Sequence, residues 1–438
     1  MSSGLNAIVI GDIEVARRTC SALRERGYHV VHLLQPTDQE LRGVLSADVK
    51  AVAVLIRGDV ISLRYALLVE HLLPGVRLVV TLFDRTIADQ LIRVVPNCLV
   101  TSPADISVPS IIGACLEDSV LAIDQSSRPP LAIVESADGV HCAPWHRDHG
   151  RSRAFLNATT GQLRAHDEPS RILSMGLAGL VSTLVLDWVL ATFALHERGT
   201  RALYVAARIV ATVGPGDADL HAPGWYLVLA SLLMLATIVF TAVFTAGVVD
   251  RLLSARSFSI IGKRAVPTRN HVVVVGLGQV GLRLCVQLRK LGIRVIAVER
   301  DPRAVNLRLA KAAGVPVLIA HAEDKAVLKQ LSLNRALALA AMGAEDLDNI
   351  EVAIAALAVA PDLRMVLRAG DDDVIAETRS LFKIGQVRNV SALTAFAVTL
   401  NLTGHAPRTV YSQGQRLSAF NGSAGEPQPT PPRCDCQA

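Results

Sequence analysis

The chain of 438 residues is 51% apolar and only 19% charged, with a mean hydropathy of +0.39. A soluble domain of ordinary composition carries roughly 25% charged residues, so a purely soluble protein is disfavoured. The net charge of +5 is too small to indicate a nucleic-acid partner, and seven scattered cysteines form no disulfide framework. The N-terminus lacks a basic region followed by an apolar core, so we expect no signal peptide and a cytoplasmic N-terminus.

The first 125 residues alternate apolar strands with helical segments, as a Rossmann-like α/β domain does. Apolar runs at 6–11 and 28–34 match the first two strands of such a domain. The segment 74–84 repeats the segment 361–371 nearly position by position, which indicates an internal duplication. We therefore predict two Rossmann-like domains, the first of them over 1–125.

This first copy has lost the features of a phosphate-binding loop. Gly11 is followed by Asp12 and Glu14, whose charges would repel a pyrophosphate, and Leu34 stands where the second copy has an acid. We expect this degenerate copy to be structural and to pair with other copies. A metal effector at the two acids is the alternative.

Residues 126–170 are rich in arginine, proline, serine and alanine, and we interpret them as a linker. The linker carries candidate zinc ligands at His141, Cys142, His146 and His149. Their spacing fits no compact zinc finger, so no metal site is predicted there.

Two long apolar runs predict a transmembrane pore domain over 171–250. Residues 172–195 and 225–249 each exceed the roughly 20 residues that cross about 30 Å of hydrocarbon as a helix. Arginine and lysine flank the outer ends of both runs, which predicts that both termini are cytoplasmic. Asp187 interrupts the first span, and an acid inside a membrane is usually functional or paired within the bundle.

The connection between the spans has a pattern of its own. An apolar helical stretch at about 200–211 is followed by Thr212, Val213, Gly214, Pro215, Gly216 and Asp217. Non-helical backbone at membrane depth is tolerated where it lines an aqueous path or is buried in protein, so this hairpin favours a pore. The two glycines allow positive φ angles that turn successive carbonyls toward one axis, where they can replace the hydration shell of a cation.

The hairpin resembles the two-span potassium channel family, whose filter reads TVGYGD after a short pore helix with an aromatic residue. The resemblance implies a pore helix and filter over 200–217, supported by Tyr204 and Arg208, with K⁺ as the permeant ion. Pro215 replaces the usual tyrosine and so removes a backbone N–H and a bracing phenol, which leaves the choice between K⁺ and Na⁺ open. An ion pair between Arg208 and Asp217 would replace that brace. One hairpin supplies a quarter of a carbonyl-lined axis, so we expect a homotetramer.

After a linker over 251–269, the chain returns to an α/β pattern. An apolar strand is followed by three glycines, and the next strand ends in an acid eighteen residues after the last glycine. These residues are Gly276, Gly278, Gly281 and Glu299. The glycines let the backbone approach a pyrophosphate at a helix N-terminus, and the carboxylate accepts hydrogen bonds from ribose hydroxyls. We predict NAD(H) or an ATP/ADP-type nucleotide as a regulatory ligand.

Residues 270–405 resemble the RCK or TrkA-N domain, which regulates potassium conductance in channels and Trk-type transporters. The resemblance implies an adenine-side contact by Glu323, because His321-Ala322-Glu323 stands where the family has Gly-Asp. No residues suited to hydride transfer or acid–base work converge in the sequence, so we predict no catalytic residues and no enzyme activity. Residues 406–438, rich in proline, glycine and serine toward their end, are expected to be a disordered tail.

Together these features predict a membrane protein in which two transmembrane helices, a pore helix and a filter loop are flanked by two Rossmann-like α/β domains. We expect a multi-pass, ligand-gated cation channel of the plasma membrane, gated by a cytoplasmic nucleotide-binding RCK ring. The alternative is a membrane-anchored nucleotide sensor, or a regulatory subunit of ion transport, that does not itself conduct. A third hypothesis is a membrane-bound NAD-dependent oxidoreductase. Ion flux separates the first two, and cofactor turnover would identify the third.

Overall fold

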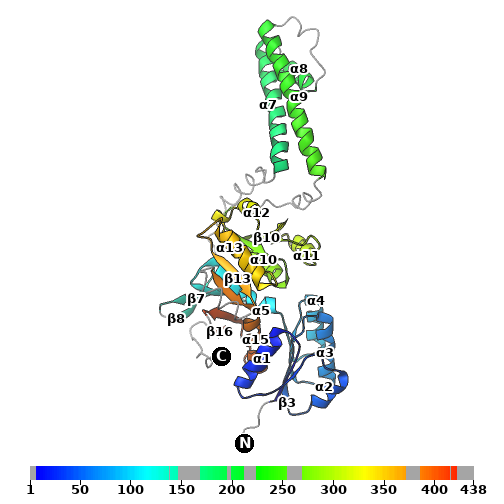
Figure 1. Cartoon of the computed structure of the whole chain (residues 1–438), viewed down its shortest axis with the longest axis vertical. Helices are drawn as coiled ribbons and strands as arrows, with labels where there is room; N and C mark the ends of the chain where they lie inside the picture. Colours follow the sequence, from blue (N-terminus) through cyan, green and yellow to red (C-terminus); the bar gives the residue numbers. More distant parts are fainter. Residues whose placement is uncertain are drawn as a thin grey trace. The chain divides into compact units, whose positions relative to one another are not determined.

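The computed structural model describes residues 6–137, 139–146, 168–194, 199–211, 223–253, 269–370, 385–414 and 416–421. They belong to two compact units. The hairpin unit comprises residues 151–265, and the α/β unit comprises 1–150 together with 266–438. The α/β unit contains two parallel sheets, so it has two lobes, each formed around one of them (Figure 1).

Lobe 1 is a five-stranded parallel sheet with the strand order β2-β1-β3-β4-β5. Its strands are β1 (Asn6–Ile10), β2 (His29–Leu33), β3 (Val49–Val54), β4 (Arg77–Thr81) and β5 (Cys98–Thr101), and its helices are α1 (Glu14–Glu25), α2 (Asp38–Val44), α3 (Asp59–Leu72) and α4 (Arg85–Val94). The central strands are buried on both faces, which is why they read as unbroken apolar runs such as Ala-Ile-Val-Ile.

Lobe 2 is a six-stranded parallel sheet with the order β11-β10-β9-β12-β13-β14. Its strands are β9 (His271–Val275), β10 (Arg294–Glu299), β11 (Val317–Ile319), β12 (Ala338–Ala341), β13 (Met365–Ala369) and β14 (Gln386–Asn389). Its helices are α10 (Gln279–Lys290), α11 (Leu307–Ala312), α12 (Lys325–Gln330), the short 3₁₀ helix η3 (Leu333–Arg335) and α13 (Asp346–Leu357). The order of lobe 1 is the same except that its described sheet has no strand in the place of β11.

Each lobe contributes one helix to the core of the other. Helix α5 (Pro103–Leu116) follows the last strand of lobe 1, but it packs on α10, β12, β13 and β14 of lobe 2. Its Ile111 lies in one apolar cluster with Val274 of β9. Helix α15 (Val390–Leu402) follows the last strand of lobe 2 and packs on α1, β3 and β4 of lobe 1, where its Val398 shares a cluster with Val9. The two lobes therefore have interdependent cores.

Two arginines at equivalent positions hold the ends of the exchanged helices. Arg77, at the start of β4, donates from Nη1 to the carbonyl of Leu402, the last residue of α15, at 2.9 Å. Arg364, next to β13, has its Nη1 3.1 Å from Asp118 Oδ1, two residues beyond α5. Both arginines occupy the same place in the repeated segments 74–84 and 361–371. A cation at a helix C-terminus is favoured by the exposed carbonyls there.

The exchange predicts that a substitution in α5 destabilises both lobes. Ile111 is fully buried, and Ile111→Ala should lower the free energy of unfolding of the α/β unit by about 2–5 kcal/mol through lost burial and a cavity. Thermal unfolding of the full chain measures the effect. Leu34→Ala is the control, because 59% of Leu34 is exposed and its truncation should change stability by less than about 0.5 kcal/mol. Equal melting temperatures for both variants would contradict the prediction.

The structure corrects two expectations of irregular chain. Residues 131–144 of the predicted linker form the strands β7 (Leu131–Ser136) and β8 (Gly139–Pro144), which pair antiparallel beside β6 (Val120–Asp124). Part of the predicted tail forms the hairpin of β15 (Thr409–Gln413) and β16 (Arg416–Phe420). Tyr411 packs with Ile133 in a small shared core. These strands are five or six residues long, so the surrounding polar composition masks their apolar alternation.

The hairpin unit contains three described helices: α7 (Glu168–Ala194), α8 (Gly199–Val210) and α9 (Gly224–Leu253). The segments 175–194 and 224–249 have mean hydropathies of 1.8 and 2.6 and are long and apolar enough to cross a membrane. Only 22% and 17% of their most apolar windows are buried in the chain. The two predicted spans are therefore helices that leave most of their apolar surface uncovered.

Close backbone approach holds α7 against α9. A Cβ atom added to Gly179 would lie 2.2 Å from the Phe240 ring, and one added to Gly176 would lie 2.7 Å from the backbone nitrogen of Phe244. Small residues at such contacts allow tight van der Waals packing where lipid supplies no hydrophobic driving force between helices. Asp187, the acid expected within the first span, is 1% exposed and lies inside the hairpin unit.

Candidate nucleotide-binding site

Three glycines shape the loop between β9 and α10, and each has a different steric reason. Gly276 has a φ of +88°, and a Cβ there would lie 3.0 Å from the backbone nitrogen of Gly343. A Cβ on Gly281 would lie 1.9 Å from the Gly276 carbonyl oxygen, so this glycine lets α10 pack onto the loop. Gly278 is the N-cap of α10, and no atom lies within 4 Å of a Cβ placed there. The space above Gly278 is open to a ligand.

The N-terminus of α10 is suited to an anion. No side chain caps this helix, and its first turn contains no acidic residue. The unpaired N–H groups of a first helical turn and the helix dipole together favour a phosphate. Glu299 lies beside the loop, where its Oε2 accepts from Leu277 N at 2.7 Å and its Oε1 accepts from Asp301 N at 3.1 Å. The carboxylate that we expect to contact a ribose is thus held next to the expected pyrophosphate position.

The other predicted contact lies at the end of the neighbouring strand. Glu323 follows β11, which pairs with β10, so Glu323 and Glu299 lie at the same edge of the sheet. Glu323 Oε1 is 3.1 Å from His321 Nδ1, and both side chains are partly exposed. In open α/β sheets a ligand binds outside the carboxyl ends of the strands, where the strand order reverses. In lobe 2 the order reverses between β9 and β12, the three glycines follow β9, and Glu299 and Glu323 follow the next two strands, β10 and β11.

Asn349 is a structural member of this site whose contacts sequence reasoning did not foresee. It is 2% exposed in the first turn of α13, accepts from Gly343 N at 2.8 Å, and donates to the carbonyls of Gly343 and Arg368 at 3.2 and 3.0 Å. One side chain therefore joins the ends of β12 and β13. In the sequence, the one sign of this role was an asparagine near the start of the helix that follows β12.

The equivalent loop of lobe 1 is closed by its own side chains. Ile13 occupies the N-cap of α1, the place that Gly278 holds in α10. The ring nitrogen Nε2 of His32 lies 2.8 Å from the Gly11 carbonyl oxygen, and Gln35 donates to Asp12 at 3.1 Å. Glu14 forms ion pairs within its own helix. These contacts favour the structural role predicted for lobe 1.

A polar contact joins the nucleotide loop to lobe 1. Arg283 lies in α10, two residues after Gly281, and its side chain is 12% exposed. Its Nη2 donates to Oδ2 of Asp105, on the exchanged helix α5, at 3.3 Å, and its Nε lies 3.0 Å from Oδ1 of the same carboxylate. Its guanidinium also lies over the Phe83 ring, 5.7 Å from the centroid. Burial lowers the pKa of Arg283, and the negative charge of Asp105 opposes that shift.

The predicted filter, Thr212 to Asp217, lies outside the described residues, so the predicted Arg208–Asp217 pair does as well. Of the two supporting residues, Arg208 lies over the ring of Tyr204, 5.9 Å from the centroid, and both lie on α8. Helix α8 is fastened to α7, since Trp188 Nε1 donates to the Gly199 carbonyl at 3.0 Å. A helix therefore covers most of the residues predicted to form the pore helix, and its role beside a filter stays a prediction.

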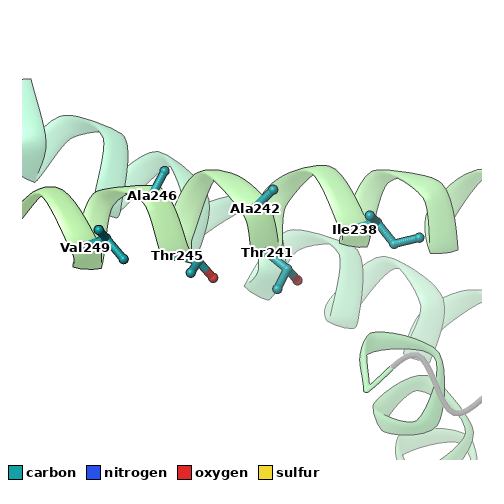
Figure 2. A pocket seen from close by; sticks show the side chains of 6 residues that line it. All are labelled: Ile238, Thr241, Ala242, Thr245, Ala246 and Val249. Atoms are coloured by element: carbon teal, nitrogen blue, oxygen red, sulfur yellow. The ribbon is translucent and has the colours of Figure 1, made fainter.

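Helix α9 has two unlike faces. Phe240 and Phe244 pack against α7. A helix turns by about 100° per residue, which places a stripe of small and β-branched residues on the opposite side. This stripe lines an open hollow of about 620 Å³ (Figure 2). Its residues are Ile238, Thr241, Ala242, Thr245, Ala246 and Val249.

Within the described ranges, no group of three or more His, Cys, Asp or Glu side chains is placed to hold a metal ion. His141 and Cys142, two of the candidate zinc ligands, lie on β8, while His149 falls outside those ranges. The described residues of the lobe 2 site therefore form a loop suited to an anion, beside carboxylates that can accept hydrogen bonds from hydroxyl groups.

Comparison with known proteins agrees with this geometry. Residues 272–386, from β9 to the start of β14, match the TrkA-N domain family. Potassium channel protein 1 of Methanocaldococcus jannaschii is 22% identical over 180 residues, covering 38% of this chain and 52% of that protein. An uncharacterized protein of Methanothermus fervidus is 23% identical over 202 residues, covering 45% of this chain and 31% of that protein. The chain thus spans about a third to a half of these curated relatives.

Among solved structures, the GsuK channel aligns with 92% of this chain and 64% of its own, at 13% identity and a TM-score of 0.51. The same channel bound to NAD aligns with a TM-score of 0.50. At this identity the likeness shows the fold. The domain match places a TrkA-N domain over 272–386, one relative by sequence is a potassium channel protein, and the GsuK channel shares the fold.

Proposed function

We propose that this chain is a subunit of a potassium-conducting cation channel whose opening is controlled by a nucleotide bound to lobe 2. The observation that carries the proposal is the combination, in one chain, of an apolar α7–α8–α9 hairpin with a TrkA-N lobe whose glycine loop is open to a ligand. The ligand is NAD(H) or an ATP/ADP-type nucleotide. It acts as a regulator, and the protein is not an enzyme.

The nucleotide part of the proposal rests on the site geometry. Open space above Gly278 and an uncapped α10 N-terminus suit a pyrophosphate, while Glu299 and Glu323 lie where a ribose and an adenine would follow. The GsuK channel, which shares the fold, has been solved with NAD bound. NAD contains an ADP moiety, so ADP is a suitable minimal probe.

The pore part of the proposal rests on the hairpin unit. Helices α7 and α9 leave most of their apolar surface uncovered, as expected of helices that contact lipid and other subunits. The stripe on α9 that faces away from α7 suits the wall of an aqueous path, since it combines two threonine hydroxyls with small side chains. Four copies around one axis would supply four TVGPGD segments. The resulting homotetramer would lie in the plasma membrane with both termini cytoplasmic.

Flux into liposomes containing the purified full chain tests the proposal. Under a potassium gradient we expect flux that changes when NADH or ADP is added, and under a sodium gradient we expect a smaller flux. Gly214→Asp should abolish flux without affecting nucleotide binding, because an acid side chain would obstruct the carbonyl-lined axis. Gly199→Ala is the matched control, as a Cβ there meets no atom within 4 Å.

Two outcomes would contradict the channel. Nucleotide binding without flux of either ion would favour the membrane-anchored sensor. Turnover of NADH would favour the oxidoreductase. Equal sodium and potassium flux would retain a channel but assign the loss of selectivity to Pro215.

A further inference from the structure

A salt bridge in lobe 2 lies at the carboxyl ends of the parallel strands, where an open α/β sheet has its ligand crevice. Arg300 directly follows Glu299 at the end of β10, and its Nη1 lies 2.9 Å from Oδ2 of Asp348, in the first turn of α13. Strand β9 lies between β10 and β12 in the sheet, and α13 follows β12. The salt bridge therefore joins the two walls of the crevice above the carboxyl end of β9, where the glycine loop begins.

The neighbouring carboxylate does not compete for Arg300. Both oxygens of Glu299 accept from backbone N–H groups, those of Leu277 and Asp301. Asp301 in turn accepts from Arg303 N at 2.8 Å. The guanidinium of Arg300 is instead directed across the crevice to Asp348.

Arg300 can leave Asp348 for another anionic partner at little cost. The side chains of Arg300 and Asp348 are 63% and 45% exposed, so either can reorient without disturbing the core. A pair as exposed as this one contributes about 0–1 kcal/mol to stability. The diphosphate of NAD or ADP carries more negative charge in total than one carboxylate, and Arg binds phosphate oxygens through two N–H groups in a geometry that suits the planar guanidinium.

We propose that Arg300 is the phosphate-binding cation of this site and that Asp348 holds it in the ligand-free protein, so that a bound nucleotide phosphate replaces Asp348 as its partner. The inference rests on the proposed nucleotide function and extends it to the phosphate contact. Asp348 thereby lowers affinity for phosphorylated ligands, because the phosphate must compete with it for Arg300. A ligand without phosphate gains nothing from Arg300.

Calorimetric titration of the full chain with ADP and with adenosine tests this exchange. Arg300→Gln should weaken ADP binding about tenfold, the size expected for losing one charge-assisted hydrogen bond, and should change adenosine binding less than about twofold. Asp348→Asn should tighten ADP binding about threefold by releasing Arg300. In the Arg300→Gln background, Asp348→Asn should have no further effect.

The matched control is Arg64→Gln, since Arg64 forms an equally exposed pair with Asp38 in lobe 1, at 2.7 Å with 62% and 50% exposure. It should leave ADP binding unchanged. Unaltered ADP affinity in Arg300→Gln, or weaker ADP binding in Asp348→Asn, would overturn the inference while the nucleotide function stands. Absence of ADP and NAD binding by the folded wild-type chain would overturn both.

Discussion

Gly281→Val should abolish nucleotide binding by the full chain, with a loss of at least about 100-fold in affinity for ADP. The substituted side chain cannot fit, because its Cβ alone would lie 1.9 Å from the Gly276 carbonyl oxygen, a backbone atom. The loop must shift away from α10, which removes the N–H geometry that a pyrophosphate needs. Overpacking of this kind also costs about 1–3 kcal/mol of stability.

A substitution at Gly278 distinguishes an effect on ADP binding from an effect on stability. In Gly278→Ala the added Cβ has no atom within 4 Å, so the melting temperature should not change. The methyl group should still obstruct the ligand and weaken ADP binding. Gly43→Ala, in α2 of lobe 1, is equally unhindered and should leave both quantities unchanged. Calorimetry and thermal unfolding measure the three variants in parallel. Wild-type ADP affinity in Gly281→Val would refute the assigned geometry.

Arg283→Met should remove the response of ion flux to nucleotide while ADP affinity stays within about threefold of wild type. We do not expect Arg283 to contact the ligand. It links the N-terminal part of α10 to the N-terminal part of α5 through Asp105. A ligand can shift a conformational equilibrium only by its differential affinity for the two states, and that difference must reach the rest of the protein through contacts of this kind. Loss of the contact should therefore weaken the coupling between the glycine loop and α5, while the exchanged helices keep the two lobes packed together.

The same substitution has a thermodynamic signature. Arg283→Met removes one charged partner of Asp105, whose side chain is 36% exposed and keeps Arg85 at 3.7 Å and the Ser102 hydroxyl at 2.9 Å. We therefore expect a destabilisation of about 2 kcal/mol, the size of one lost hydrogen bond to a charged group. Combining it with Asp105→Asn should recover part of this loss, as a double-mutant cycle on thermal unfolding can measure. Arg64→Met removes an exposed pair instead and should be neutral. Additive single effects, together with nucleotide-sensitive flux in Arg283→Met, would contradict the coupling.

The exchanged helices give the degenerate lobe a role. Lobe 1 has a closed loop and no described strand in the place of β11, yet α5 supplies part of the core of lobe 2. If lobe 2 alone binds the nucleotide, as we propose, lobe 1 can still stabilise lobe 2 and respond to it through the exchanged helices. For this role lobe 1 must keep its fold, but it does not need a ligand-binding loop.

The sequence by itself determined the local elements and their order. Apolar runs of about 20 residues or more predicted α7 and α9, and short unbroken Val-rich runs predicted the parallel strands, because the length of an apolar run separates a long helix from a strand. The spacing of Gly276, Gly278 and Gly281 predicted the strand–loop–helix turn, since side chains are sterically excluded at positions 276 and 281 and a ligand approaches at 278.

The tertiary structure decided which elements share a core. Helix α5 is apolar on nearly every side, so its sequence states that it is buried but not against which sheet. The contacts of Arg283 with Asp105 and of Arg300 with Asp348 join residues 178 and 48 positions apart, a separation that no local pattern encodes. The short strands β7, β8, β15 and β16 are ordered by pairing and by a shared core rather than by their own composition. The composition of one segment shows that the segment is apolar, whereas the element against which it packs depends on the fold of the whole chain.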